Sequence, residues 1–551
     1  PGPLPGREEV NGSVTVGVKG QSSAWPLLIA AAVALAALQL WLRPLLPVDE
    51  TRYLSVAWEM WSHHEFLVPR LNGAAYSHKP PLLFWLIHGL WALSGVSEWP
   101  VRLLPVVLSL VAMWWSAALA GQLWPQRAAQ LRPLVPWLLF GSLFWMNFYS
   151  LVQFDLLLVL AALGAWSGLL RARERALSGW SLVALGIGFG VLSKGPVILV
   201  PVLPAMLFAP WWQASRPTAW GRWYFGALAA LLGGAALALA WAIPAGLAGG
   251  EAYRAAIFWG QSAGRIAASF AHPHPWWSYL VWLPLLWLPW LLWPPLVRGL
   301  RGLSLDDAGV RFCLAVLLPA LLVFSLISGK QPKYLLPLLP LVALLSARGL
   351  ADISNPRVHY RQWLAGGLVL VFGVALTALP WWPGGPAWLA QVQPLWGPAL
   401  MLWSVPLFRW RPHLPQALRG TVLAAWLVTA TVYLAVVDLM APQYRLQGLA
   451  AQLGELQQSG HDIAWLGRYH GQFQFLGRLR QPVQALTDKA GLRDWLAAHP
   501  DGYVVVKYSV ARPRVPDTLT IRPYRSGSLV LWPAQRLLHS PAQLDALAGN
   551  A

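Results

Sequence analysis

Long apolar stretches, separated by short polar connections, dominate the first 440 residues of the chain. Many of them approach the roughly 20 residues that an α-helix needs to cross a bilayer. The pattern predicts about thirteen membrane spans, over Trp25–Leu42, Val101–Leu123, Leu134–Tyr149, Phe154–Leu170, Gly179–Leu192, Val197–Trp211, Tyr224–Leu247, Trp276–Pro295, Phe312–Ile327, Tyr334–Ala347, Leu364–Leu379, Gly397–Phe408 and Thr421–Val437. The chain is therefore predicted to be a polytopic α-helical membrane protein.

The pattern changes at both ends of this apolar region. Residues 1–24 are polar and rich in glycine and proline, so we expect a flexible tail. The first apolar run leads directly into a charged loop, which favours a retained helix over a cleaved signal peptide. From about residue 441 the pattern is that of a small soluble α/β domain, with helices at Leu446–Leu456 and Leu492–Ala498 and strands at Ile463–Leu466, Tyr503–Val506 and Ser528–Trp532. The predicted parts are thus 1–24, a transmembrane domain over 25–440 and an α/β domain over 441–551.

The formal net charge of +19 is explained mainly by topology. Lysine and arginine accumulate in the cytoplasmic loops of membrane proteins. Alternate connections of this chain carry arginines: Arg127, Arg132, Arg171, Arg173, Arg175, Arg216, Arg222, Arg298, Arg301, Arg311, Arg348, Arg357, Arg361, Arg409, Arg411 and Arg419. These connections are predicted to be cytoplasmic, which places the remaining loops and the C-terminal domain on the outer face.

The first outer loop, Pro47–Pro81, concentrates acids, cations, histidines and aromatic residues in a chain of which only 11% is charged. Apolar residues recur at helical spacing on either side of its polar centre, at Tyr53, Val56, Ala57, Met60, Trp61 and again at Leu82, Trp85, Leu86, Gly89, Leu90 and Leu93. This pattern predicts two helices lying at the membrane surface. They would hold Asp49, Arg52 and Lys79 near the lipid headgroups. An isolated acidic pair such as Asp49 and Glu50 could instead simply cap a helix.

A second acid, Asp155, opens a predicted span near its outer end. Ionisable groups at membrane depth are costly and normally face a cavity or a partner. Asp155 is expected either to form a structural ion pair with a lysine or arginine, or to share an outward-facing cavity with Asp49.

Cations on the predicted outer face run against the usual charge distribution of membrane proteins. They lie at the ends of spans: Arg52, Lys79, Lys194, Arg265, Lys330 and Lys333. Each lysine alone could be an anchor that reaches to the interface. Together they favour an anionic ligand such as a phosphate, which needs fixed positive charges for binding and for departure as a leaving group.

Histidines in two outer loops raise the question of a metal. His272 and His274 lie in a proline- and tryptophan-rich segment, and His78 or Glu50 could complete a set of ligands. A divalent metal ion is therefore a candidate cofactor. Structural histidines bound by hydrogen bonds are the alternative.

Several motifs together resemble one enzyme family. They are D-E-T-R-Y after the first span, V-P-R-L-N-G-A-A-Y-S-H-K-P-P in the loop, F-D at the start of the fourth span and S-K-G-P after the fifth. In this combination the chain is similar to the bacterial aminoarabinose transferases, in the protein O-mannosyltransferase-like superfamily of C-type glycosyltransferases. The resemblance covers most of the chain.

The resemblance implies roles for particular residues. Asp49 and Asp155 match the two acids of the family, and Lys79 matches the lysine expected on the donor phosphate. Substrate-binding roles are expected for the neighbouring positions and for further outer-face residues, namely Glu50, Arg52, Tyr53, Arg265, Lys333 and Tyr334. His78 stands where family members often carry glutamate, which leaves the metal assignment of His78, His272 and His274 open.

The implied activity is an inverting sugar transfer at the periplasmic face of the bacterial inner membrane. The donor would be an undecaprenyl-phosphate-linked sugar, with 4-amino-4-deoxy-L-arabinose as the first choice, and the acceptor a lipid A phosphate. A different sugar, or a glycan or protein acceptor, is the alternative within the family. A lipid transporter or flippase is the competing class, although the sequence lacks a recognisable internal repeat of the kind transporters carry.

Overall fold

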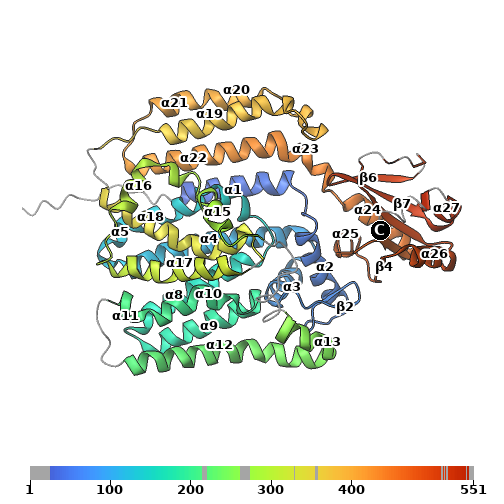
Figure 1. Ribbon diagram of the computed structural model, residues 1–551, viewed down its shortest axis with the longest axis horizontal. Helices are drawn as coiled ribbons and strands as arrows, with labels where there is room; N and C mark the ends of the chain where they lie inside the picture. The colour runs from blue at the N-terminus through green and yellow to red at the C-terminus, as the bar shows by residue number, and fades with distance from the viewer. Residues whose placement is uncertain are drawn as a thin grey trace, which may run out of the picture.

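The computed structural model consists of a body of long, roughly parallel helices with a smaller domain attached at one end (Figure 1). It describes residues 25–540 except 214–219, 261–273, 328, 354–357, 511–512, 514 and 517–518, and it also describes 543 and 544. The predicted N-terminal tail, Arg265 and His272 lie outside the described residues.

Nine helical segments in the described part of the chain are long and apolar enough to cross a membrane. Most contain a single α-helix: α1 (Trp25–Leu42), α4 (Glu98–Leu123), α8 (Asp155–Ala172), α9 (Ala176–Lys194), α12 (Trp220–Ala248), α17 (Ala308–Leu326), α18 (Leu339–Ile353) with η5 (Pro332–Leu338), α19 (Trp363–Ala378) and α22 (Leu414–Val432). A polytopic α-helical membrane protein, the predicted fold class, is confirmed.

The four remaining predicted spans coincide with interrupted helices. They are built from α6 (Leu134–Phe140) with α7 (Leu143–Phe148), η2 (Pro196–Ile198) with α10 (Leu199–Leu207), α15 (Ser278–Leu286) with η4 (Trp290–Leu292), and α20 (Trp396–Leu402) with α21 (Ser404–Arg409). Proline explains one break, because Pro289 lacks the amide hydrogen that a continuing helix would need. The span number of thirteen stays a prediction.

The two ends of the helical body differ in the connections they carry. Short helices among the arginine-rich connections lie at one end (Figure 1): α5 (Ala128–Leu131), α11 (Ala209–Trp212), α16 (Pro294–Arg301) and α21. The opposite end carries α2 (Asp49–Ser62), α3 (Leu82–Ser94), α13 (Gly250–Ala255) and the C-terminal domain. The alternation of arginine-rich loops in the sequence therefore corresponds to two physical ends of the molecule.

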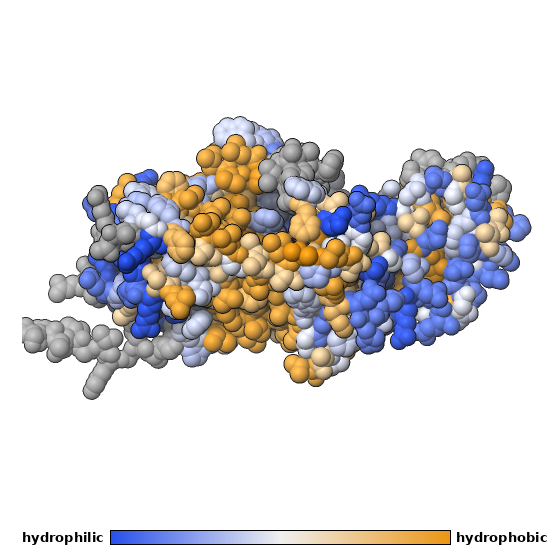
Figure 2. Space-filling view, turned by 90° about the horizontal axis from the view of Figure 1, so that it is seen from below, coloured by the Kyte–Doolittle hydropathy of each residue, from blue (hydrophilic) through white to orange (hydrophobic). Residues whose placement is uncertain are grey.

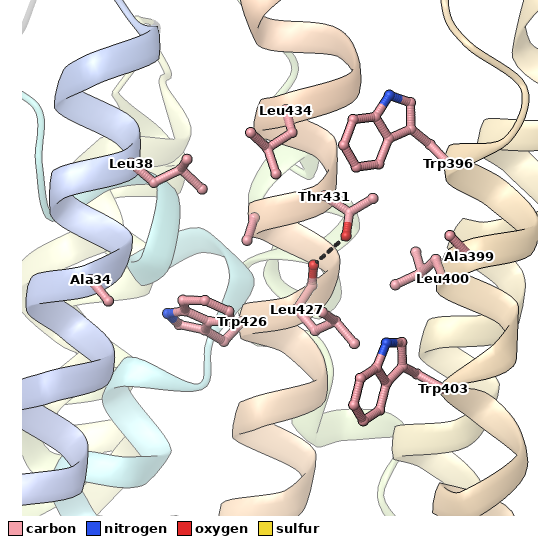
Figure 3. Close-up of a pocket in the computed structure, with 11 residues that line it drawn as sticks. Ala34, Leu38, Trp396, Ala399, Leu400, Trp403, Trp426, Leu427, Thr431 and Leu434 are labelled. Atoms are coloured by element: carbon pink, nitrogen blue, oxygen red, sulfur yellow. Dashed lines mark hydrogen bonds between the residues drawn. The ribbon is translucent and has the colours of Figure 1, made fainter.

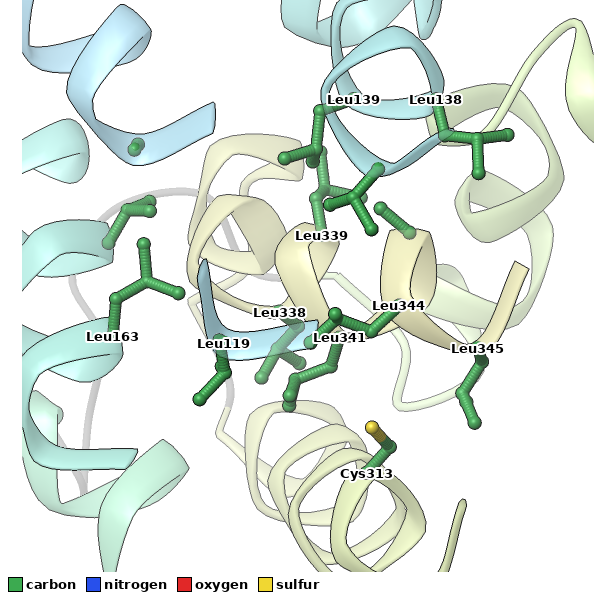
Figure 4. Packing of buried hydrophobic residues seen from close by; sticks show 14 of the residues in the cluster. Leu119, Leu138, Leu139, Leu163, Cys313, Leu338, Leu339, Leu341, Leu344 and Leu345 are labelled. Atoms are coloured by element: carbon green, nitrogen blue, oxygen red, sulfur yellow. The ribbon is translucent and has the colours of Figure 1, made fainter. Parts of the chain in front are cut away.

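Apolar side chains cover the body between these ends. Figure 2 shows hydrophobic residues over the middle of the body and hydrophilic residues at the far end and over the C-terminal domain. Leu119 of α4, Leu163 of α8 and Leu341 of α18 belong to the buried interior beside Cys313 of α17 (Figure 4). Helix α8 is buried along nearly all of its length, so Asp155 opens the most enclosed of the candidate spans.

The C-terminal domain is built around a five-stranded sheet with strand order β4-β3-β5-β7-β6. Its strands are β3 (Ile463–Leu466), β4 (Gln484–Leu486), β5 (Tyr503–Tyr508), β6 (Thr520–Tyr524) and β7 (Gly527–Pro533). Strands β3, β4 and β5 are parallel, whereas β7 runs antiparallel to both β5 and β6. Helices α24 (Gln447–Gln458), α25 (Gln474–Gly477), α26 (Lys489–Ala498) and α27 (Ala534–Leu538) complete it. The small α/β domain is as predicted, with two strands that the sequence pattern did not reveal.

The first outer loop folds into α2, a two-residue hairpin of β1 (Arg70–Leu71) and β2 (Ala74–Ala75), and α3. Helices form where the two apolar stripes predict them. Trp91 of α3 stacks on Phe475 of the C-terminal domain with ring centroids 5.5 Å apart. The loop is thus held between the membrane helices and the C-terminal domain.

Candidate active site

Asp49 lies at the start of α2 between two cations. Its carboxylate oxygens accept hydrogen bonds from Arg52 at 3.0 Å and from Lys333 Nζ at 3.1 Å. Arg52 is one turn further along α2, whereas Lys333 comes from η5, 284 residues away in the sequence. The Asp49 side chain remains 39% exposed. This cluster can therefore still be reached by a ligand.

Asp155 and its partner Lys194 lie on the neighbouring helices α8 and α9. Asp155 is the first residue of α8 and Lys194 the last of α9, and the two side chains form an ion pair that is almost completely buried. Lys194 Nζ also lies 4.6 Å from the ring centroid of Tyr334, a cation–π arrangement. The ion pair that we considered for Asp155 is therefore present.

The short helix η5 joins the two acidic groups. Its consecutive residues Lys333 and Tyr334 face different partners, since Lys333 binds Asp49 and Tyr334 covers Lys194. Pro332 and Pro337 fix backbone angles within this segment. A single turn of chain thus connects the Asp49 cluster with the Asp155–Lys194 pair.

Aromatic rings lie close to the two acids. Tyr53 is buried and packs edge-on against Phe154 with centroids 5.0 Å apart. Lys79 Nζ lies 5.6 Å from the same Phe154 ring. Phe154 directly precedes Asp155, so it links the loop lysine to the second acid. The sequence motif F-D contained this signal, but only the structure assigns a contact to the phenylalanine.

Electrostatics keep Asp49 ionised and Tyr53 neutral. Burial alone would raise the pKa of Asp49, but Lys333, Arg52 and Lys79 outweigh it, and the pKa is lowered from its usual value. Burial and the negative charge of Asp49 raise the pKa of the Tyr53 hydroxyl well above its usual value. Asp49 is therefore a permanent negative charge at neutral pH and a weak base.

Glu50 lies beside Asp49 but in a closed environment. Its carboxylate is buried, pairs with Arg43 and accepts hydrogen bonds from the amides of Leu46 at 2.9 Å and Val152 at 2.8 Å. Val152 precedes Asp155 by three residues. Glu50 thus ties the start of α2 to the start of α8 and sets the two candidate acids relative to each other. We predicted that Glu50 binds substrate, and the structure places it in this internal contact.

The predicted metal ligands do not converge in the part of the chain that is described. His78 is exposed and lies beside the ring of Tyr76, with centroids 5.4 Å apart, and the ring of His274 lies against Trp282 at 5.1 Å. Among the described residues, no group of three or more histidine, cysteine, aspartate or glutamate side chains is placed to hold a metal ion. His272 belongs to the undescribed segment 261–273, as does Arg265. The metal site stays a prediction.

An apolar groove elsewhere in the body contains no titratable group. It lies between α1, α20 and α22 and has a volume of about 460 Å³ (Figure 3). Three tryptophans, Trp396, Trp403 and Trp426, contribute to its wall, and the Thr431 hydroxyl donates to the Leu427 carbonyl at 2.8 Å. Its lining is almost entirely apolar and suits hydrocarbon.

Comparisons with known proteins show which proteins the chain resembles. Residues 78–245 match the model of the dolichyl-phosphate-mannose-protein mannosyltransferase family. The chain is 29% identical to an undecaprenyl phosphate-α-4-amino-4-deoxy-L-arabinose arabinosyl transferase of Pseudomonas aeruginosa, over 88% of this chain and 93% of that protein. A relative of the same name from Erwinia tasmaniensis is 31% identical over 62% of each chain.

Solved structures show the same fold. The apo structure of ArnT from Cupriavidus metallidurans aligns with a TM-score of 0.73 and 17% identity, over 94% of this chain and 99% of that chain. A second structure of that protein, bound to undecaprenyl phosphate, aligns with a TM-score of 0.71 and 17% identity, over 93% of this chain and 98% of that chain. The resemblance found in the sequence is confirmed: the chain is similar to the bacterial aminoarabinose transferases over most of its length, and part of it matches the protein mannosyltransferase family.

Proposed function

We propose that the protein transfers 4-amino-4-deoxy-L-arabinose from an undecaprenyl-phosphate donor to a phosphate of lipid A. The observation that carries the proposal is the half-exposed Asp49, held between Arg52 and Lys333 with Lys79 close by. The names of relatives that align over most of the chain give the donor and the sugar.

The positive charges fit a phosphate leaving group. In an inverting transfer, an acceptor oxygen forms a bond to the anomeric carbon while the bond from that carbon to the donor phosphate oxygen breaks. The bonding electrons leave with undecaprenyl phosphate, whose acidic oxygen needs no protonation. Fixed cations stabilise the charge that develops. Lys79, Lys333 and Arg52 would supply this stabilisation.

The low pKa of Asp49 favours a phosphate acceptor over a hydroxyl. A hydroxyl nucleophile needs a general base, and an efficient base has a pKa near the working pH. Three cations lower the pKa of Asp49 below its usual value despite its burial. A phosphate is already ionised at neutral pH and needs no base. Asp49 would then orient the acceptor, or balance the amino group of the aminosugar.

We assign the active site to the periplasmic face of the bacterial inner membrane. Support comes from the arginine-rich connections, which lie at the end of the helical body opposite to Asp49. A divalent ion near His78 and His274 is a further proposal. Dialysis against a chelator, with metal analysis and activity before and after, tests it.

Mass spectrometry of lipid A from cells that supply the aminoarabinose donor tests the proposed function. Cells expressing the protein should gain one aminopentose on a lipid A phosphate, and cells without it should not. The Asp49→Asn variant, at equal membrane abundance, should abolish the gain. Unmodified lipid A in the presence of folded wild-type protein would redirect the proposal to another sugar or acceptor.

A further inference from the structure

Two loops of the C-terminal domain reach the start of α2. The parallel strands β3 and β5 end at the same edge of the sheet, and the pairing of Tyr508 with Ser528 places the β6–β7 turn there as well. In open α/β sheets, the carboxyl ends of parallel strands are where ligands usually bind. Here this edge faces the first outer loop.

The β6–β7 turn is attached to the residues that precede Asp49. Arg525 occupies this turn with a left-handed backbone, φ 54°. Its amide donates to the Gln443 carbonyl at 2.9 Å, and its Nη2 donates to the Pro47 carbonyl at 3.1 Å. The guanidinium of Arg525 is therefore held by Pro47, which precedes Asp49 by two residues in the sequence.

The loop after β3 presents two more basic residues at the same junction. Tyr469 anchors it, because its buried hydroxyl donates to Gln474 Oε1 at 2.7 Å and accepts from the Phe473 amide at 3.2 Å. Arg468 and His470 flank this anchor and remain accessible. A Cβ added at Gly471 would lie 2.3 Å from Leu71, so this loop is in close contact with the first outer loop.

Several positive charges converge at this junction. Burial and the charges of Arg52, Arg468 and Arg525 together lower the pKa of His470. Asp49 is shared among Arg52, Lys333 and Lys79. Arg52 Nε is also buried without a hydrogen-bond partner among the described residues. Like charges repel when they are brought together, and an anion bound between them removes that cost.

We infer that Arg468 and Arg525 of the C-terminal domain bind the phosphate of the acceptor lipid. Arg52 acts both on Asp49 and on His470 and so lies between the two groups, and it remains for the donor phosphate together with Lys79 and Lys333. The transfer brings the donor phosphate and the acceptor phosphate close to each other. Two separate sets of cations would hold the two phosphates at different positions and balance the charge of each. This inference rests on the proposed function, since it assigns a site to that reaction's acceptor.

Kinetics with the purified full-length protein in detergent test the inference. The Arg468→Gln and Arg525→Gln double variant should raise the KM for lipid A about tenfold or more, because both charged hydrogen-bond donors to the phosphate are lost. The KM for the donor should change less than about twofold. With Arg468 intact, Arg525→Lys keeps the positive charge and should raise the KM for lipid A less than Arg525→Gln does.

Arg522→Gln is the matched control. Arg522 is an exposed arginine of β6, three residues before Arg525, and it is not among the groups that act on His470. Its replacement removes the same charge from the same domain and should leave both KM values unchanged. An equal rise of the acceptor KM in this control would mean that only net charge matters and would overturn the inference. An unchanged acceptor KM in the double variant, or an equal rise of the donor KM, would also overturn it.

A binding measurement separates this inference from the proposed function. Lipid A and enzymatically dephosphorylated lipid A are titrated onto the wild-type protein and the double variant in nanodiscs. Wild type should prefer the phosphorylated lipid, and the double variant should lose that preference. If transfer is not detected but the preference is lost as expected, the acceptor site stands and the proposed reaction fails. A preference that persists in the double variant would refute the site itself.

Discussion

Two adjacent acids at the start of α2 have opposite surroundings. Glu50 is 1% exposed, and its pairing with Arg43 and two backbone amides leaves no room for a ligand. Asp49 is 39% exposed, and its partners Arg52 and Lys333 are themselves partly accessible. A closed ion pair fixes the fold, whereas an open one can exchange a protein partner for a substrate. The difference predicts different consequences for substitutions at neighbouring positions.

Loss of Glu50 should have the largest effect. Glu50→Ala leaves Arg43 as a buried, unpaired charge, which typically costs about 3–5 kcal/mol. The variant should be poorly folded and almost absent from the membrane, as measured by thermal unfolding and membrane yield. Glu50→Gln keeps one acceptor oxygen, which can serve only one of the amides of Leu46 and Val152, and should be milder than Glu50→Ala. A stable and active Glu50→Ala protein would remove the distinction between the two acids.

Loss of the Asp49 charge should affect activity and spare the fold. Exposed ion pairs contribute only about 0–1 kcal/mol to stability. Asp49→Asn should therefore unfold near the wild-type temperature while transfer falls by about a hundredfold or more, as expected when a preorganised charge is removed. Thermal unfolding and initial rates on the same preparation measure both effects. Parallel losses of stability and rate would show that Asp49, like Glu50, is structural.

Removal of the Tyr334 ring that lies over Lys194 should have a smaller effect. Tyr334→Leu removes the ring over the Lys194 ammonium, an interaction of about 0.5–2 kcal/mol. We expect a loss of rate of about threefold to thirtyfold. Tyr334→Phe keeps the ring and is the matched control. If Leu and Phe variants had the same rate, the ring would not contribute through its cation–π contact.

The pH dependence should be the smallest effect. Lys333, Arg52 and Lys79 keep the pKa of Asp49 below its usual value, so its contribution to stability is present above the unfolded pKa of about 3.9 and is lost only as pH falls through the lower folded pKa. Transfer should consequently show no acid-side loss from Asp49 between about pH 5 and 7. A rate that falls with an apparent pKa near 6, and no longer does so in Asp49→Asn, would contradict the charge assignment.

Most of the fold could be predicted from the pattern of apolar residues. The span Trp25–Leu42 and the strand Ile463–Leu466 agree with the structure to the residue, because a charged residue, Arg43 or Asp462, marks one end of each pattern. Strands β4 and β6 were missed. Gln484–Leu486 is too short for a pattern, and Thr520–Tyr524 carries an arginine and a proline. Interrupted helices also hide their breaks within uniformly apolar sequence.

The sequence predicted which residues belong to the candidate site, but not which of them contact one another. Motifs singled out Asp49, Asp155 and Lys79, but partners from distant segments were beyond local sequence, as in the contact of Lys333 with Asp49. The sequence could not separate Glu50 from Asp49 either, since only burial distinguishes them. The C-terminal domain had no recognisable motif. The proximity of Arg525 to Pro47 depends on a contact across 478 residues.

The most direct test of the account is the fate of the donor lipid in detergent, where no membrane gradient exists. Purified protein is incubated with undecaprenyl-phosphate aminoarabinose and lipid A, and both lipids are quantified by mass spectrometry. We predict that free undecaprenyl phosphate and aminopentose-modified lipid A appear in equal amounts. A donor that remains intact beside folded protein would contradict the account and favour a lipid transporter.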